Sequence, residues 1–390
     1  MKKMTDRILI SRRGLIGAAC SLAAAPILSP VSLAAVPGDS RFVTIVLRGA
    51  MDGLDLVQPY GDLAFRQLRP KLALTPDTGL IDLDGRFGLH PAAAALEPLY
   101  RRGELGFVHA VSTPYRDGRS HFDGQDMLEG GGSAQRGSEG GWLNRVLTLT
   151  RNPAPAIDVS VTPEMILSGP NPADVWAPRS DIALADDELQ MLARLYRNDP
   201  AYTKALSDAV GVDAFTDLLR GEAVEDRHGA AAAKLAGTML RDKYRIASFS
   251  INGWDTHVNQ KAQFQPAARI LSGAITTLRE SLGEAAWAQT AVLAVTEFGR
   301  SAHENASGGT DHGTGGCAII AGGAIRGGKV YGRFPGLDDS DLLDGRDLMP
   351  TGDVRHIAAA ILASQFGISG SALRSSVFPG LQEEARVAFL

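Results

Sequence analysis

The chain has 390 residues, of which 44 are glycine and 21% are charged, and its formal net charge is −5 at pH 7. This length suits one large α/β domain or two smaller ones. The acidic balance gives no sign of the basic face that nucleic-acid binding requires, so we expect no nucleic-acid partner.

Residues 1–35 have the pattern of a cleaved export signal. A basic start is followed by the twin-arginine motif SRRGLI at 11–16 and by an Ala-rich apolar segment. Pro26 and Pro30 interrupt that segment, so we expect no stable membrane insertion, with an uncleaved anchor as the alternative. The twin-arginine translocase is therefore the expected partner during export, and the periplasm the expected location. We expect residues 36–390 to form a single domain.

The first two predicted core strands each end in polar residues. Residues 41–47 are β-branched and apolar and lead to Asp52, a carboxylate flanked by glycines that indicates either a ligand site or a plain surface turn. Residues 105–111 form the second predicted strand. A helix is predicted to begin near Ser120 and His121, where free N–H groups suit an oxyanion.

Two further predicted strands lead to more carboxylate and imidazole side chains. Residues 245–251 lead to Asp255 and His257, which lie two residues apart in extended chain and therefore point to the same side. Residues 291–296 lead to a glycine-rich stretch that ends near Gly316. The ionisable residues of this stretch include Glu297, Arg300, Asp311 and His312.

The intervening segments are predicted to be helical. The segment from about residue 180 to about residue 240 contains no residues that we expect in a functional site, and we expect it to form a helical insertion or cap over the core. Residues 263–282 have the pattern of an amphipathic helix, and residues 353–366 that of a terminal helix capped near Thr351.

The strand-end residues together predict a metal site. Carboxylates and imidazoles suit zinc or another borderline divalent cation, and two cations would use six ligands well. We therefore expect one or two divalent ions, zinc first, with manganese, calcium or magnesium as alternatives. The expected ligands are Asp52, Asp255, His257, Glu297, Asp311 and His312.

Four motifs carry a resemblance to a known family. RGAMDGLDLVQPYGD, RSHFDGQDMLEGG, WDTH and TEFGR…GGTDHGTGG, after a twin-arginine signal, resemble the bacterial domain-of-unknown-function 1501 family, which is placed in the alkaline phosphatase and sulfatase superfamily. The resemblance implies an α/β fold with a doubly wound, mostly parallel central sheet flanked by helices. It also implies a metal site at the carboxyl ends of the central strands, with Asp52, Asp255, His257, Asp311 and His312 among its residues.

The expected activity is hydrolysis of a small anionic ester, either a phosphate or a sulfate. Ser120, His121 and Arg300 are the expected catalytic residues. Ser112, Thr113 or a metal-bound water is the alternative nucleophile. Hydroxyls at a helix start are commonly caps, so the alternative interpretation is that none of these hydroxyls is a nucleophile. Arg48, Arg116 or Arg119 could hold the anionic group in place of Arg300. The alternative function is that of a non-catalytic relative that binds or assembles at the cell envelope.

Overall fold

The computed structural model describes residues 39–116, 118–132, 140–150, 155–160, 162–176, 229–383 and 389. It also describes the backbone of a separate antiparallel strand pair, β1 (Ile8–Leu9) with β9 (Ala183–Leu184). Most of the predicted export signal and of the predicted helical insertion lies outside the described residues. None of the helices within the described ranges is both long and apolar enough to cross a membrane.

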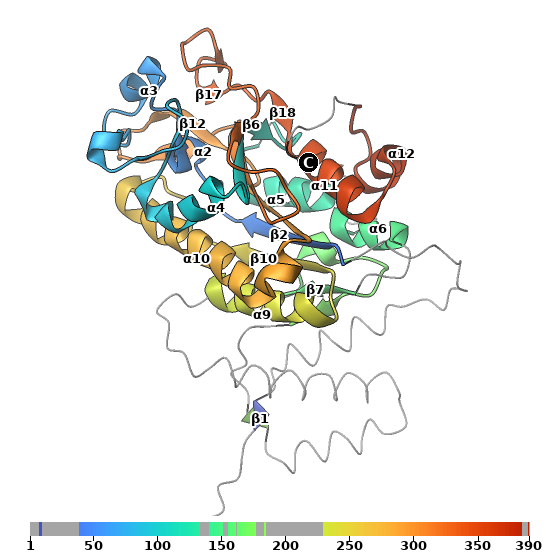
Figure 1. Cartoon of the computed structure of the whole chain (residues 1–390). Coiled ribbons are helices and arrows are strands. Elements are labelled where there is room, and N and C mark those ends of the chain that lie inside the picture. The colour runs from blue at the N-terminus through green and yellow to red at the C-terminus, as the bar shows by residue number, and fades with distance from the viewer. Residues whose placement is uncertain are drawn as a thin grey trace, which may run out of the picture.

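A nine-stranded sheet forms the centre of the protein (Figure 1). Every neighbouring pair is parallel except those made by one strand, β14, which runs antiparallel to both of its neighbours, β6 and β11. The strand order is β15 (Val330–Tyr331), β6 (Leu105–Ser112), β14 (Gly316–Ala321), β11 (Thr290–Val295), β2 (Arg41–Leu47), β10 (Ile246–Ile251), β7 (Ala156–Asp158) and β8 (Asp174–Val175). The ninth strand, β18 (Gly352–Asp353), also pairs with β6.

Helices cover both faces of this sheet, as the alternation of buried side chains requires. Val43, Ile45 and Leu47 of β2 pack in one apolar cluster with α9 (Gly229–Asp242) and α10 (Gln260–Trp287). Phe42 and Val46 point the other way, into a cluster with α5 (His121–Gly130), α6 (Trp142–Leu149) and α11 (Val354–Phe366). Figure 1 shows the two helix layers on opposite sides of the strands. The fold is therefore a doubly wound α/β sandwich, as predicted.

Two small sheets and several short helices lie around this core. The first sheet comprises β3 (Val57–Gln58), β5 (Gly88–Leu89) and β4 (Ile81–Asp82); the second comprises β13 (Thr310–His312), β12 (Arg300–Glu304), β17 (Asp347–Leu348) and β16 (Leu342–Leu343). The short helices are α2 (Gly53–Leu56), α3 (Leu63–Leu68), η1 (Pro76–Thr78), η2 (Pro91–Leu96), α4 (Glu97–Arg101), η3 (Met165–Leu167), α12 (Gly370–Ala372) and the π-helix η4 (Leu373–Val377).

The second small sheet was not expected from the sequence. Arg300 lies at the start of β12 and His312 at the end of β13, and the two residues are paired in register. The ionisable residues that follow β11 are thus held partly by a hairpin rather than by a plain loop. The cap of α11 also differs from expectation, because the Asp353 carboxylate, and not Thr351, accepts a hydrogen bond from the backbone N–H of Arg355.

Candidate metal centre

Three histidines and one aspartate meet above the carboxyl ends of the central strands. His121 is the first residue of α5, Asp255 and His257 follow β10, and His312 ends β13. His121, Asp255 and His312 form a group that could hold a metal ion, with ligand atoms all within 4.8 Å of one another. Thus segments almost 200 residues apart in the sequence supply one cluster.

The ring Nε2 atoms of the histidines face the carboxylate of Asp255. The His257 Nε2 lies 3.1 Å from Asp255 Oδ1, and the His312 Nε2 lies 3.3 Å from the same oxygen. The two Nε2 atoms of His257 and His312 are 2.9 Å apart. The His121 Nε2 lies 3.4 Å from Asp255 Oδ2, and this buried nitrogen forms no hydrogen bond.

The opposite nitrogen of each ring, Nδ1, faces an oxygen acceptor. The Nδ1 of His121 lies 2.8 Å from Glu297 Oε1, and that of His312 lies 2.8 Å from the backbone carbonyl of Arg119. The Nδ1 of His257 lies 3.5 Å from Asp311 Oδ1. These partners assign the proton to Nδ1 in each neutral ring and leave a lone pair on Nε2. An oxygen partner behind a histidine is the usual support of a metal ligand.

This arrangement fits a bound cation. Two lone pairs that face each other across 2.9 Å repel unless a proton or a cation lies between them. Zinc–nitrogen bonds of about 2.0–2.1 Å in tetrahedral geometry place neighbouring ligand atoms about 3.3 Å apart. The separations of 2.9, 3.1 and 3.3 Å among His257, His312 and Asp255 are close to that value.

The surrounding charges support ionised carboxylates in this group. Burial alone would raise the pKa of Glu297, but hydrogen bonds from His121, Thr296 and the N–H of Gly49 lower it below its ordinary value. The hydrogen bond to Glu297 raises the pKa of His121. Burial would also raise the pKa of Asp255, but the hydrogen bond and charge of Arg300 outweigh it and lower that pKa.

Burial affects the pKa of the His312 ring in the opposite direction from the pKa of the two carboxylates. It lowers the pKa of His312, which favours the neutral imidazole that a metal ligand requires. His312 thus combines a neutral ring with a fixed Nδ1 partner, and both features suit a ligand role.

Arg300 connects the backbone around the site. Its guanidinium is buried and donates to the carbonyl oxygens of four residues and to Asp255 Oδ1, the last at 2.6 Å. The second N–H of Nη1 faces His257 Nε2 at 3.4 Å, so every N–H group of the side chain has a partner and none is left to hold an anionic substrate. The four carbonyls belong to Gly49, Ala50, Trp254 and Thr310.

Asp52 is held away from the histidines. It caps α2, with Oδ1 accepting from the N–H groups of Leu54 and Asp55. Its Oδ2 accepts from Arg69 Nη1 at 2.8 Å and from Gln260 Nε2 at 2.7 Å. Both oxygens are therefore committed, and the contacts favour a structural role over the expected role as a metal ligand.

The other expected residues divide into two groups. Of the six expected ligands, Asp255, His257 and His312 point ligand atoms at one another, whereas Glu297 and Asp311 lie behind histidine rings. His121, expected to be catalytic, joins the ligand group instead. The sequence pattern WDTH indicated Asp255 and His257, but no pattern indicated the Arg119 carbonyl, because every residue carries one.

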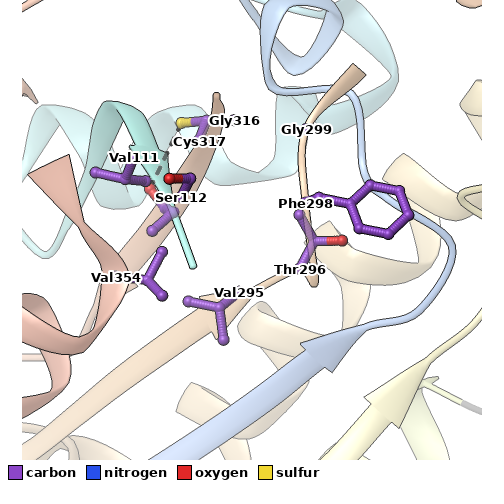
Figure 2. Close-up of a pocket in the computed structure, with 10 residues that line it drawn as sticks. Val111, Ser112, Val295, Thr296, Phe298, Gly299, Gly316, Cys317 and Val354 are labelled. Carbon is purple, nitrogen blue, oxygen red and sulfur yellow. Dashed lines mark hydrogen bonds between the residues drawn. The ribbon is translucent and has the colours of Figure 1, made fainter. Parts of the chain in front are cut away.

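No candidate nucleophile touches this group within the described ranges. The Ser120 hydroxyl caps α5 by accepting from the N–H of Asp123, and the Thr113 hydroxyl donates to the carbonyl of Glu297. Ser112 lines a small cavity with Thr296 and Cys317 (Figure 2). That cavity has room for about one water molecule, so it is too small for an ester substrate.

The family model described as "Protein of unknown function (DUF1501)" matches residues 109–377. The chain belongs to this family. The match agrees with the family predicted from the four motifs. No curated protein matches the chain.

Several solved structures share distant similarity with this family member. Ps i-CgsB is 9% identical with a TM-score of 0.44, and its complex with k-i-k-neocarrahexaose is 8% identical with a TM-score of 0.40; in both cases the match covers 86% of this chain and 74% of the other. A protein of the alkaline phosphatase superfamily from Vibrio parahaemolyticus is 11% identical, with a TM-score of 0.33, and the match covers 82% of this chain and 71% of that one.

Proposed function

We propose that the protein is a metal-dependent hydrolase of phosphate or sulfate esters. The observation that carries the proposal is the convergence of three histidine Nε2 atoms on Asp255, each ring with its Nδ1 turned toward an oxygen. A bound divalent cation would act as a Lewis acid and lower the pKa of a water molecule. Imidazole and carboxylate donors favour zinc, with manganese as the next candidate.

The residues around the cation site have separable roles in this proposal. His121, Asp255, His257 and His312 hold the ion, and Glu297 and Asp311 orient two of the rings. Since no described serine or threonine hydroxyl hydrogen-bonds to these four side chains, the proposal assigns the attack on the ester to water rather than to Ser120. Ser120 then acts as the cap of α5 and thereby fixes the position of His121.

Arg119 is the arginine best placed to bind the anionic group of the ester. Arg48 pairs with buried carboxylates, Arg300 is fully engaged, and Arg116 binds the carbonyls of Thr113 and Tyr115. The Arg119 side chain is half exposed, and its own carbonyl accepts from His312. Its guanidinium can therefore reach solvent close to the ligand group, where it would pair with a phosphate or sulfate.

Export to the periplasm by the twin-arginine translocase forms part of the proposal. It is supported by the SRRGLI motif and the apolar segment that follows. That pathway carries folded proteins, which suits a protein that acquires its metal before export.

Metal analysis of the folded protein tests the cation site. We expect about one zinc ion per chain after reconstitution, and loss of that ion in a His121→Ala, His312→Ala double variant. His303→Ala is the matched control, because His303 is exposed and contributes no ring atom to the group. Equal zinc content in all three proteins would overturn the assignment.

Turnover of generic esters tests the reaction. We expect hydrolysis of p-nitrophenyl phosphate, bis(p-nitrophenyl) phosphate or p-nitrophenyl sulfate by the zinc protein, abolished by chelation and restored by zinc. Arg119→Met should raise KM with zinc content unchanged. Zinc binding without turnover of any of the three esters would favour the second candidate, a binding protein of the cell envelope. The absence of a hydroxyl partner among the described residues of the ligand group is the observation that favours that candidate.

A further inference from the structure

A second group of acidic residues lies buried beside the central sheet. Asp158 ends β7, Glu129 lies on α5 and Glu164 precedes η3, and their exposed fractions are 1%, 3% and 9%. Arg48 is their cationic partner, with Nη1 2.7 Å from Glu129 Oε1 and Nη2 3.3 Å from Glu164 Oε1. One guanidinium faces three carboxylates, and burial raises the pKa of two of them, Asp158 and Glu164.

A row of unpartnered oxygens crosses the sheet at the same place. Thr44 of β2, Ser248 of β10 and Asp158 of β7 are register partners on three adjacent strands, so their side chains lie side by side on one face. Figure 1 shows these strands together. All three residues are at most 1% exposed, and Thr44 Oγ1, Ser248 Oγ and Asp158 Oδ1 have no partner at hydrogen-bonding distance and angle. The Ser160 hydroxyl lies near the Asp158 carboxylate, and it opposes the rise in the pKa of that group.

Glu164 brings a further oxygen to this row. Its backbone N–H donates to Asp158 Oδ2 at 2.6 Å, which places the two residues in contact. Its Oε1 binds Arg48 and the Ser250 hydroxyl, two residues beyond Ser248 on the same face of β10. Its Oε2 is buried and forms no hydrogen bond.

Such a set is costly in a protein interior unless something binds it. A buried polar atom without a partner destabilises by about 1–3 kcal/mol, and an ionised one by more. Burial and the charge of Glu164 raise the pKa of Asp158 to about 7. A divalent cation would supply the missing partner for the oxygens and would favour the ionised form of both carboxylates.

We propose that Thr44, Asp158, Glu164 and Ser248 form a binding site for a hard divalent cation, with calcium as its ion. The donors are all oxygens, which calcium prefers and zinc does not require. Calcium tolerates irregular geometry, whereas magnesium demands a near-octahedral shell and keeps several waters. The site is distinct from the histidine group and does not depend on the proposed hydrolysis.

The site is connected to the histidine group through hydrogen bonds. Arg48 donates to Gln125 Oε1 at 2.9 Å, and Gln125 Nε2 donates to Glu297 Oε1 at 3.3 Å. Glu297 in turn accepts from His121. A cation beside Asp158 and Glu164 would therefore stabilise the scaffold that orients His121.

Thermal unfolding of the zinc-saturated protein tests the proposal. We expect the calcium-depleted protein to bind about one calcium ion per chain on titration. Its Tm should rise by a few degrees at a calcium concentration about 100 times Kd. Magnesium at the same concentration should give a smaller shift. Asp158→Asn should lose the calcium shift, whereas Asp174→Asn, which changes a partly exposed aspartate on β8, should keep it.

A second variant keeps the test decisive if Asp158→Asn does not fold. Thr44→Val with Ser248→Ala removes two unpartnered hydroxyls, so it should fold at least as well as the wild type without calcium. We expect this variant to bind calcium at least tenfold more weakly and to retain its zinc. Calcium binding and Tm shifts equal to those of the wild type, or no effect of calcium on the wild type itself, would overturn the proposal.

Discussion

Replacing Arg300 tests whether this residue stabilises the fold or takes part in catalysis. In Arg300→Met, four backbone carbonyls and the Asp255 carboxylate lose their donor. At about 1.5–3 kcal/mol for each bond to a charged group, five bonds contribute roughly 7–15 kcal/mol, against several kcal/mol of guanidinium desolvation that the variant no longer incurs. We therefore expect the free energy of unfolding to fall by about 5 kcal/mol.

Urea denaturation of the zinc-saturated protein is the assay. Arg300→Lys keeps the charge and up to three donors but not the planar fork, so we expect about half of that loss. Arg119→Met is the matched control, because its half-exposed guanidinium lies 4.0 Å from its nearest carboxylate partner, Asp347. It should change stability by no more than about 0.5 kcal/mol. An Arg300→Met variant within about 1 kcal/mol of the wild type, yet without turnover, would refute the structural role and restore Arg300 as a catalytic residue.

Three further predictions concern the two sites. Glu297→Gln should weaken zinc binding by about 10–100-fold in a competition titration, because a neutral amide oxygen is a weaker acceptor for the His121 Nδ1–H than a carboxylate; an unchanged affinity would contradict the orienting role. Gly309→Ala should destabilise the protein and lower its zinc affinity, since the added Cβ would lie 2.3 Å from the carbonyl carbon of His257, whereas Gly308→Ala, where no atom lies within 4 Å, should be affected only through its positive φ. In calcium-free protein, the pKa of Asp158 is about 7 in the folded state and 3.8 in the unfolded state, so the folded state binds more protons between these pH values. The free energy of unfolding should therefore fall as pH rises, by up to about 1.4 kcal/mol per pH unit. Asp158→Asn should flatten that slope, and an unchanged slope in urea titrations would count against the prediction.

The central strands could be predicted because they are buried on both faces. Such strands are continuous runs of apolar and β-branched residues, and the first run, Arg41–Leu47, coincides with β2. The predicted strands at 105–111 and 245–251 differ from β6 and β10 by one residue at one end, and the predicted strand at 291–296 is shifted by one residue at both ends relative to β11. Parallel strands place their carboxyl ends at one edge, so the neighbourhood of Asp255 and Glu297 also followed from the sequence.

The small sheet and the division of roles could not be predicted in this way. Strands β12 and β13 are short, and β12 is only partly buried, so neither carries a hydrophobic period. A sequence also does not show which carboxylate meets a cation and which meets Nδ1 of a ring. Asp52 illustrates the difficulty, because its pairing with Arg69 and Gln260 depends on residues 17 and 208 positions away.

Backbone strain adds an independent argument that the histidine group is a functional centre. Three non-glycine residues with left-handed backbone adjoin it: Ala50, Arg119 and Asn259, with φ of 59°, 46° and 47°. The carbonyl of Ala50 accepts from Arg300, that of Arg119 accepts from His312, and Asn259 leads from His257 into α10. Such conformations cost about 1–3 kcal/mol each and persist only where surrounding contacts enforce them. At Arg119 the enforcing contact is the hydrogen bond from His312 Nδ1, so strain at this residue is coupled to the position of one Nε2 atom.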